Sequence, residues 1–199
     1  MKFILASNNK GKLKEMQAIM SGLGYEVISQ SEAGLDLDVE ETGTTFEENA
    51  FLKADAACKA SGLPAVSDDS GLVVEALGGE PGVYSARYAG EDKTDHDRNM
   101  YLLKKMEGIE NRKAKFVSAI VCVFPNGDRI TAIGQCHGEI IHEERGENGF
   151  GYDPLFYMPE FGRTMAEISS EEKNKASHRA RALQEFGKKL IEYLEIKEH

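Results

Sequence analysis

Short apolar runs and segments of helical periodicity alternate along the first part of the chain. Residues 2–6 form an apolar run that predicts a buried strand, and apolar side chains then recur at helical spacing over 12–20. Residues 25–29 predict a second strand. The acidic, glycine-containing stretch 34–43 is expected to be a loop.

Two threonines are placed to cap helices. Thr45 and the glutamate three residues later fit a capping box, which opens an alanine-rich helix ending near residue 60. Thr94 is expected to cap a helix that ends near residue 106. Between these helices, residues 78–90 surround an aromatic and basic core with glycines and a proline, which predicts an ordered loop.

The later part of the chain predicts antiparallel strands and a final helix. Residues 116–124 and 129–136 flank Pro-Asn-Gly-Asp, which is a strong hairpin signal. A glycine-rich loop at 148–154 precedes a last helix from near residue 170. Because helices separate the early strands and a hairpin joins the later ones, we expect an α/β fold with a mixed β-sheet and flanking helices.

The acidic pair Asp68-Asp69 falls between two predicted strands, 63–67 and 72–76. Adjacent carboxylates repel one another unless a cation, hydrogen-bond donors or solvent compensates. At a strand end the pair is expected to lie on an exposed rim, where a turn at Gly71 aims one carboxylate into a cleft. Mg²⁺ prefers one or two carboxylates with phosphate oxygens and water, but Asp-Asp-Ser-Gly is also good composition for a plain turn. Both interpretations stay open.

Composition and charge narrow the function classes. No apolar stretch approaches the roughly 20 residues that span a bilayer, so we expect a soluble cytoplasmic protein without membrane contact. The formal net charge of -10 argues against a protein that coats a nucleic acid polymer. Cys58, Cys122 and Cys136 have no zinc-site spacing and are expected to be core thiols.

A small anionic ligand could bind where the first strand hands over to the first helix. Backbone N–H groups at a helix N-terminus attract anions, but the segment has neither P-loop nor dinucleotide-fold spacing. Phosphate binding and a polar loop with solvated lysines therefore both remain as interpretations. The segment consists of Ser7, Asn8, Asn9, Lys10, Gly11 and Lys12.

Other candidate residues lie apart in the sequence. Glu40-Glu41 could complete a metal site, although an acidic loop is also typical of a solvated surface. Lys53, on the alanine-rich helix, is ordinarily a solvent-facing type. The segment Phe150-Gly-Tyr-Asp suits stacking on a base, with a rigid turn as the alternative. Ser177-His-Arg is expected inside the last helix, one to two turns after a lysine at 173, as a cationic or merely polar face.

Six segments, taken together and in this order, closely resemble the inosine triphosphatase family of non-canonical purine nucleotide pyrophosphatases. They are SNNKGK (7–12), TFEENA (45–50), SDDSGL (67–72), GVYSARYAG (82–90), FGYDP (150–154) and SHR (177–179). The resemblance covers nearly the whole chain. It implies one domain over residues 1–199, an elongated mixed sheet with two lobes around a central cleft, and a homodimer. The implied reaction converts ITP, dITP and XTP to the monophosphate and pyrophosphate.

The resemblance also implies residue roles. Asp69 would be the catalytic base and a ligand of Mg²⁺, with Glu41, or its neighbour Glu40, as the second ligand. Substrate would be bound by Ser7, Asn8, Asn9, Lys10, Gly11 and Lys12 at the triphosphate, by Lys53 and Ser70, and at the nucleoside by Phe150, Gly151, Tyr152, Asp153, Lys173, His178 and Arg179.

The implied mechanism is metal-assisted attack by water. Mg²⁺ bridges phosphate oxygens to the carboxylates, Asp69 deprotonates a water that attacks the α-phosphorus, and pyrophosphate leaves. Arg179, or backbone donors of 150–153, would bond a 6-oxo purine, whereas adenine would leave those donors unpaired. The role of Asp68 and the rejection of GTP stay open.

Two other functions fit part of the sequence. A septum-inhibitor-type pyrophosphatase acting on modified pyrimidine nucleotides would share the strand-loop-helix opening, but the FGYD and SHR segments argue against it. A nucleotide-sensing module would bind without turnover through the same basic loop and aromatic stack. The joint presence of Asp68, Asp69 and Glu41 makes that module the less economical interpretation.

Overall fold

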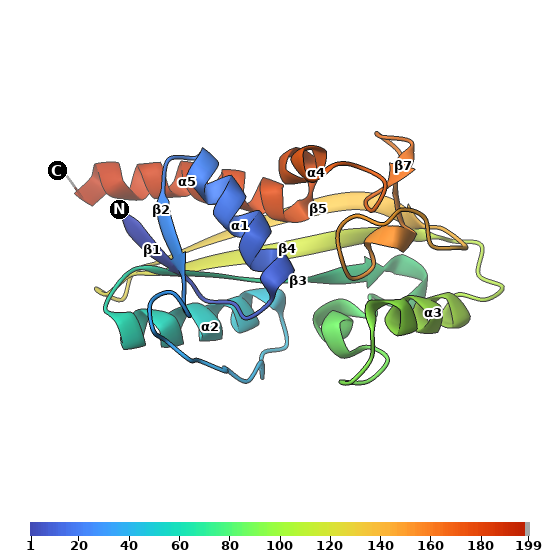
Figure 1. Ribbon diagram of the computed structural model, residues 1–199, viewed down its shortest axis with the longest axis horizontal. Coiled ribbons are helices and arrows are strands. Elements are labelled where there is room, and N and C mark those ends of the chain that lie inside the picture. Colours follow the sequence, from blue (N-terminus) through green and yellow to red (C-terminus); the bar gives the residue numbers. More distant parts are fainter. Residues whose placement is uncertain (198–199) are drawn as a thin grey trace. The chain divides into compact units, whose positions relative to one another are not determined.

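The structure is a computed structural model that describes residues 1–197. Its seven strands form one sheet in the order β2-β1-β3-β4-β5-β6-β7 (Figure 1). Strand β1 pairs in parallel with β2 and β3, whereas β6 pairs antiparallel with β5 and β7. The strands are β1 (Lys2–Leu5), β2 (Glu26–Ser29), β3 (Ala65–Val74), β4 (Lys113–Val123), β5 (Arg129–Ile140), β6 (Phe156–Met158) and β7 (Arg163–Thr164).

Within residues 1–197, five α-helices and three short 3-10 helices accompany the sheet. They are α1 (Lys10–Gly22), α2 (Phe46–Ser61), η1 (Glu75–Leu77), η2 (Gly82–Arg87), α3 (Asp95–Lys105), η3 (Asp153–Leu155), α4 (Ser170–Ala176) and α5 (His178–Lys197). The predicted mixed sheet with flanking helices is confirmed. No helix within residues 1–197 is both long and apolar enough to cross a membrane.

The chain divides into two compact units. Unit 1 contains Met1–Asp69, Ser118–Gly134 and the chain from His178 onward, and unit 2 contains Ser70–Val117 and Gln135–Ser177. Strands β3, β4 and β5 therefore each contribute residues to both units.

In unit 1 the sheet is covered on both faces, and alternate residues of each strand face opposite layers. Phe3 and Leu5 pack in a cluster with side chains of α1 and α5, whereas Ile4 packs in a second cluster with alanines of α2. Figure 1 shows α1 and α5 on one side of these strands and α2 on the other. Strand β3 follows the same rule, since Val66 belongs to the first cluster and Ala65 to the second.

Unit 2 has an apolar core of its own. Strand β3 contributes Leu72, strands β4 and β6 contribute Phe116 and Phe156, and α3 contributes Leu102. Met106, the residue that caps the end of α3, belongs to the same core. The 3-10 helix η2 is tied to this core, because Leu72 N donates to Ser85 Oγ at 2.9 Å. The stretch 78–90, predicted as an ordered loop, thus includes a short helix.

Local signals in the sequence are confirmed where they were strongest. Thr45 and Thr94 each accept a hydrogen bond from the residue three positions later, and both helices carry complete capping boxes. Backbone hydrogen bonds from Phe124 to Asp128 and from Ile140 to Arg112 pair β4 with β5 as the predicted hairpin. The three cysteines are buried, as expected for core thiols.

Two elements differ from their predictions. Residues 63–67 and 72–76 were expected to flank an acidic turn, but β3 continues through Asp68, Asp69 and Gly71 as one strand of 10 residues. The last helix is not continuous, because Ser177 is extended (ψ 162°) and separates α4 from α5. A smaller difference is that α1 begins at Lys10 rather than near residue 12.

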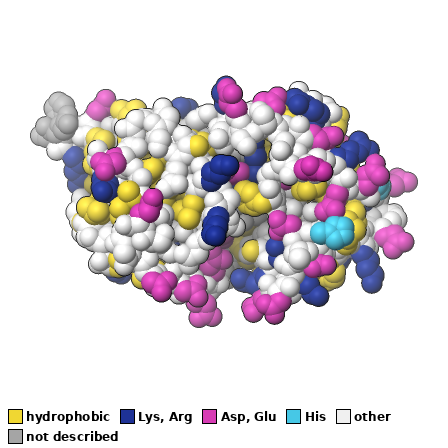
Figure 2. All heavy atoms as spheres, in the orientation of Figure 1, with side chains coloured by type: hydrophobic (Ala, Val, Ile, Leu, Met, Phe, Trp, Pro, Cys, Tyr) yellow, Lys and Arg dark blue, Asp and Glu magenta, His cyan; other side chains and the backbone are white. Residues whose placement is uncertain are grey.

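Charged side chains are mixed over the surface. Figure 2 shows acidic and basic groups interspersed across the visible face, with apolar side chains between them. The net charge of -10 is therefore not gathered into one patch on that face.

Candidate functional site

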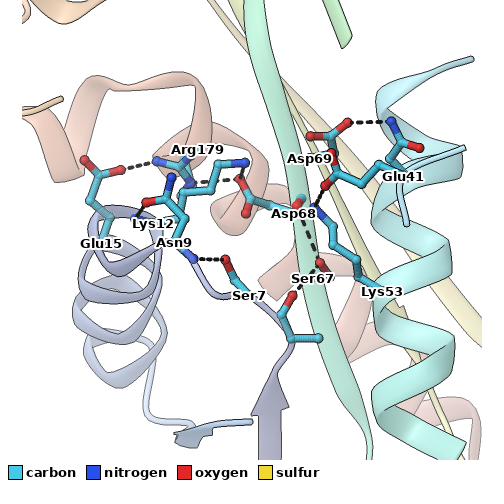
Figure 3. A network of polar contacts seen from close by, with 12 residues as sticks. Ser7, Asn9, Lys12, Glu15, Glu41, Lys53, Ser67, Asp68, Asp69 and Arg179 are labelled. Atoms are coloured by element: carbon cyan, nitrogen blue, oxygen red, sulfur yellow. Dashed lines mark hydrogen bonds and ion pairs between the residues drawn. The ribbon is translucent and has the colours of Figure 1, made fainter. Parts of the chain in front are cut away.

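Asp68 and Asp69 lie inside strand β3, so their side chains leave it on opposite sides (Figure 3). The expected exposed rim is wrong, because Asp68 is fully buried and Asp69 is only 5% exposed. No turn is needed to separate the two carboxylates, since the pleat of the strand already does so. The two residues accordingly have different surroundings.

Asp68 faces the layer of α1 and α5 and is surrounded by cations. Its Oδ2 lies 3.1 Å from Arg179 Nε and 3.5 Å from Lys12 Nζ, and Arg179 also pairs with Glu15 of α1. Burial alone would raise the pKa of Asp68, but the charges of Lys12 and Arg179 hold that pKa well below its ordinary value. Asp68 is therefore an ionised carboxylate at neutral pH.

The same network acts on its cations. Burial lowers the pKa of Lys12, partly offset by the attraction of Asp68. The pKa of Arg179 is raised, since its two carboxylate neighbours outweigh the effect of burial. Asp68 thus pairs with two buried cations, of which Arg179 is also paired with Glu15.

Asp69 faces the side of α2. Its Oδ2 accepts a hydrogen bond from Asn49 Nδ2 at 3.1 Å, and Asn49 Oδ1 in turn accepts from Gly43 N at 2.7 Å. Burial raises the pKa of Asp69, and the nearby carboxylate of Glu41 raises it further, against the lowering effect of Lys12 and Lys53. Asp69 is the more basic of the two adjacent carboxylates.

Glu41 and Lys53 form a pair beside Asp69. Their charged atoms Oε1 and Nζ are 2.5 Å apart, and both side chains are mostly buried. Glu41 and Asp69 place two carboxylates near each other, a donor set that a hard cation such as Mg²⁺ stabilises, and Mg²⁺ needs only one or two carboxylates. Within residues 1–197 no group of three or more potential ligands meets, so the fit is that of a site completed by phosphate oxygens and water.

The segment 7–12 joins β1 to α1. Asn9 is the N-cap of α1, accepting from Lys12 N at 3.1 Å, and Asn9 N donates to Ser7 Oγ at 3.2 Å. Asn8 is held against the acidic loop, because its Nδ2 donates to Leu37 O at 3.0 Å and its Oδ1 accepts from Gln30. Lys10, Gly11 and Lys12 form the first turn of the helix, where N–H groups lack partners within the helix.

The loop at 150–153 is an ordered structure of unit 2. Phe150 N donates to Asp153 Oδ2 at 3.0 Å, and Lys173 Nζ lies 2.6 Å from the same oxygen. Lys173 Nζ also lies 4.4 Å from the centre of the Phe150 ring. Tyr152 is anchored through its hydroxyl, which donates to Ser85 O at 2.7 Å. An aromatic ring, a cation and a carboxylate are thus held in contact.

The candidate residues fall into two groups. Unit 1 brings together the phosphate-loop candidates of 7–12 with Glu41, Lys53, Asp69, His178 and Arg179, and unit 2 holds Ser70, Phe150, Gly151, Tyr152, Asp153 and Lys173. The idea that Lys173 and Arg179 share one helical face is wrong, because Ser177 breaks the helix between them. His178 is buried at the first position of α5.

Two residues that contact the site were not singled out from sequence. Asn49 donates a hydrogen bond to Asp69, and Glu15 pairs with Arg179. Asn49 lies within the TFEENA segment, where it follows the capping glutamate directly. Glu15 gave no signal, because its partner is 164 residues away along the chain.

Comparisons with known proteins agree over almost the whole chain. A model of the Ham1 family matches residues 3–189. The dITP/XTP pyrophosphatase of Haemophilus influenzae is 54% identical over 193 residues, covering 95% of this chain and 98% of the relative. That of Thermus thermophilus is 51% identical over 185 residues, covering 92% and 88%. The solved structure of the Staphylococcus aureus Ham1 protein superposes with a TM-score of 0.87 at 46% identity, covering 97% of this chain and 100% of that one.

Proposed function

Because this chain belongs to the Ham1 family, we propose that it is a hydrolase that converts ITP, dITP and XTP to the nucleoside monophosphate and pyrophosphate. The names of its relatives support this substrate class. The observation that carries the proposal is the division of labour on β3, where one carboxylate is paired with buried cations and the next has a raised proton affinity.

Asp69 is proposed as the general base. A carboxylate with a raised pKa accepts a proton more readily than an ordinary one, and Asn49 fixes its orientation. Asp68 is unsuited to this role, since proton uptake would remove the negative charge that it places beside Arg179 and Lys12. Asp68 instead orients the two cations.

The phosphates are proposed to lie at the first turn of α1. Lys12 supplies charge there, the backbone N–H groups of Lys10 and Gly11 are available to donate to phosphate oxygens, and Asn9 fixes where the helix begins. Lys53 adds a second cation on the other side of β3. Ser7, Asn8, Lys10 and Gly11 complete the loop, and Ser70 contacts the substrate from the next residue of the strand.

Asp69 and Glu41 are proposed to hold Mg²⁺. When bound, the ion would neutralise phosphate charge and polarise the bond to the leaving group. Lys53, which pairs with Glu41, would then be released toward the phosphates. Glu40 is exposed and has no contact comparable to the pair of Glu41 with Lys53 among the described residues, which favours Glu41 as the ligand.

The nucleoside is proposed to bind at 150–153. The ring of Phe150 offers a stacking surface, and Lys173 and Asp153 offer a donor and an acceptor beside it. His178 and Arg179 are proposed to contribute from the start of α5. A 6-oxo group accepts hydrogen bonds from such donors, whereas the 6-amino group of adenine leaves them unpaired.

In the reaction, Asp69 takes a proton from a water molecule as that water attacks the α-phosphorus. The bond between the α-phosphorus and the bridging oxygen breaks, and pyrophosphate leaves with the bond electrons. Lys12 and Lys53 offset the charge that develops on the phosphate oxygens. We further propose that residues 1–199 act as one domain, in the cytoplasm and as a homodimer, without a membrane or nucleic acid polymer as partner.

The test is hydrolysis of ITP, dITP, XTP, dTTP, GTP and ATP by the purified protein, with and without Mg²⁺. Pyrophosphate and orthophosphate are measured separately. We expect pyrophosphate as the first product from the first three substrates, and loss of turnover when Mg²⁺ is removed. Orthophosphate as the first product contradicts attack at the α-phosphorus. Preference for dTTP favours a pyrimidine nucleotide enzyme, and binding of ITP without turnover under every metal condition favours a sensor.

A further inference from the structure

The backbone N–H and C=O of Gly151 are each bound by a side chain of helix α3. Asp95 Oδ2 accepts from Gly151 N at 2.8 Å, and Asn99 Nδ2 donates to Gly151 O at 3.2 Å. Asp95 and Asn99 are four residues apart, so they lie on one face of the helix, one turn from each other. We call Asp95, Asn99 and Gly151 the α3 clamp.

The clamp is built into unit 2 rather than formed by chance at the surface. Asn99 is only 1% exposed, and its second Nδ2 hydrogen is directed at Glu144 Oε1, 2.6 Å away. The other oxygen of Glu144 lies 2.7 Å from His96 Nδ1, so α3 grips that carboxylate from two residues. Both donors of the Asn99 amide are therefore used, which fixes its orientation.

Gly151 is the residue of the loop that most needs such support. Its φ of 63° lies in the left-handed region. Glycine adopts positive and negative φ about equally readily, so Gly151 itself does little to favour this conformation. It links Phe150 to Tyr152 and Asp153, which are proposed to bind the nucleoside. Its N–H belongs to the peptide that joins Phe150 to Gly151, and its C=O to the peptide that joins Gly151 to Tyr152. The two side chains therefore restrain the backbone on both sides of Gly151, including the peptide that follows Phe150.

The buried side chain of Asn99 is not the most stable choice at its position. Its Oδ1 is buried without a hydrogen-bond partner among the described residues. An unpaired buried amide oxygen is destabilising, and an apolar side chain could fill the same space without it. The presence of an amide at this position is explained by the two hydrogen bonds that it donates, to Gly151 and Glu144.

We propose that Asn99 and Asp95 are positioning residues for base recognition, which fix the backbone on both sides of Gly151 and thereby the position of Phe150 before it. This inference rests on the proposed assignment of 150–153 to the nucleoside. Neither residue needs to contact the substrate. A loop that is already in its binding conformation loses less entropy when substrate binds, so the clamp acts on KM and on discrimination between bases.

The test compares Asn99→Ala and Asp95→Ala with Thr94→Ala. Thr94 caps the same helix, so its loss weakens α3 without removing a partner of Gly151. Asp95→Asn serves as the conservative variant, because an amide oxygen can still accept from Gly151 N. We measure kcat and KM for ITP and ATP, and amide hydrogen exchange of a peptide covering 148–153 in the free protein.

We expect Asn99→Ala and Asp95→Ala to raise the KM for ITP about tenfold, with kcat changed less than about threefold, and to narrow the discrimination between ITP and ATP. Exchange in 148–153 should become faster than in Thr94→Ala. Asp95→Asn should restore both values toward the wild type. Thr94→Ala should lower the unfolding temperature while leaving KM unchanged.

Three outcomes overturn the proposal. The first is amide exchange in 148–153 that is no faster in Asn99→Ala and Asp95→Ala than in Thr94→Ala. The second is an equal loss of kcat for ITP and ATP in these two variants, which indicates a merely structural role. The third is an Asp95→Ala protein with wild-type KM and discrimination, which also decides the matter if Asn99→Ala does not fold. A wild-type protein that fails to hydrolyse ITP contradicts the proposed function instead, and the exchange experiment still tests the clamp.

Discussion

At the scale of single residues, neighbouring carboxylates of one strand are given opposite tasks. The environment of Asp68 favours its charged form, and the environment of Asp69 disfavours it. Because strand residues alternate in direction, a spacing of one residue is enough to place them in different layers. Substitution by asparagine keeps the shape of each side chain and removes only its charge, so the two variants should differ in phenotype.

Asp69→Asn should lose activity and keep stability. An amide cannot accept the proton of the attacking water, which should lower kcat by about 10²–10⁴-fold. Because the raised pKa of Asp69 shows that its charge is unfavourable in the folded protein, the free energy of unfolding at pH 7 should be equal or higher. Steady-state kinetics and urea denaturation measure the two effects, and a variant with full activity refutes the assignment.

Asp68→Asn should lose stability, and the loss should depend on pH. Removing one partner of a buried ion pair costs about 3–5 kcal/mol. The pKa of Asp68 is lower in the folded chain than its unfolded value of about 3.9, so its contribution is complete above that pH and is lost as the pH falls toward the folded pKa. Denaturation of both proteins between pH 7 and 2.5 should show a difference that narrows only below about pH 4. A difference that is constant with pH would exclude the ion pair as its cause.

At the scale of elements, α5 packs unusually close to β5. A Cβ added to Gly134 would overlap the carbonyl oxygen of His178 and the backbone N of Ala182. Gly134→Ala should therefore push the start of α5 away and cost about 1–3 kcal/mol. Gly22→Ala is the matched control, since Gly22 ends α1 with no heavy atom within 4 Å of the added carbon. Urea denaturation should show the control unchanged or slightly stabilised, and equal effects in both variants would contradict the close approach.

Elements defined by local chemistry could be predicted from sequence. The capping box at Thr45 satisfies the helix N-terminus through residues three positions apart, so its outcome needs no distant partner. Strand β3 could not be predicted in this way. Asp-Asp-Ser-Gly has turn composition. Asp68 can be buried within a strand because Lys12 and Arg179 compensate its charge, and Arg179 is 111 residues away.

The break at Ser177 could not be predicted from local sequence either. Helical spacing of apolar residues continues across it, so periodicity alone predicts one helix. In the structure, α4 carries Lys173, which pairs with Asp153, and α5 begins next to Arg179, which pairs with Asp68. The motifs named the residues of the candidate site, but which of them touch each other depended on contacts distant in sequence.

At the scale of the whole molecule, three strands run through both compact units. Because these strands continue along the chain from one unit into the other, we expect the described chain to unfold in one cooperative transition. Leu102→Ala, in the core of unit 2, should cost about 2–5 kcal/mol. Native-state hydrogen exchange should then show the same loss of protection in peptides of β1 and α3. Loss confined to unit 2 would show that the units unfold independently.

The position of water attack tests the central claim most directly. ITP is hydrolysed in water enriched in ¹⁸O with Mg²⁺ present, and the products are separated and analysed by mass spectrometry. If Asp69 activates water at the α-phosphorus, one ¹⁸O atom appears in the inosine monophosphate and the released pyrophosphate carries none. Label in pyrophosphate or orthophosphate, with unlabelled nucleotide, would contradict the account.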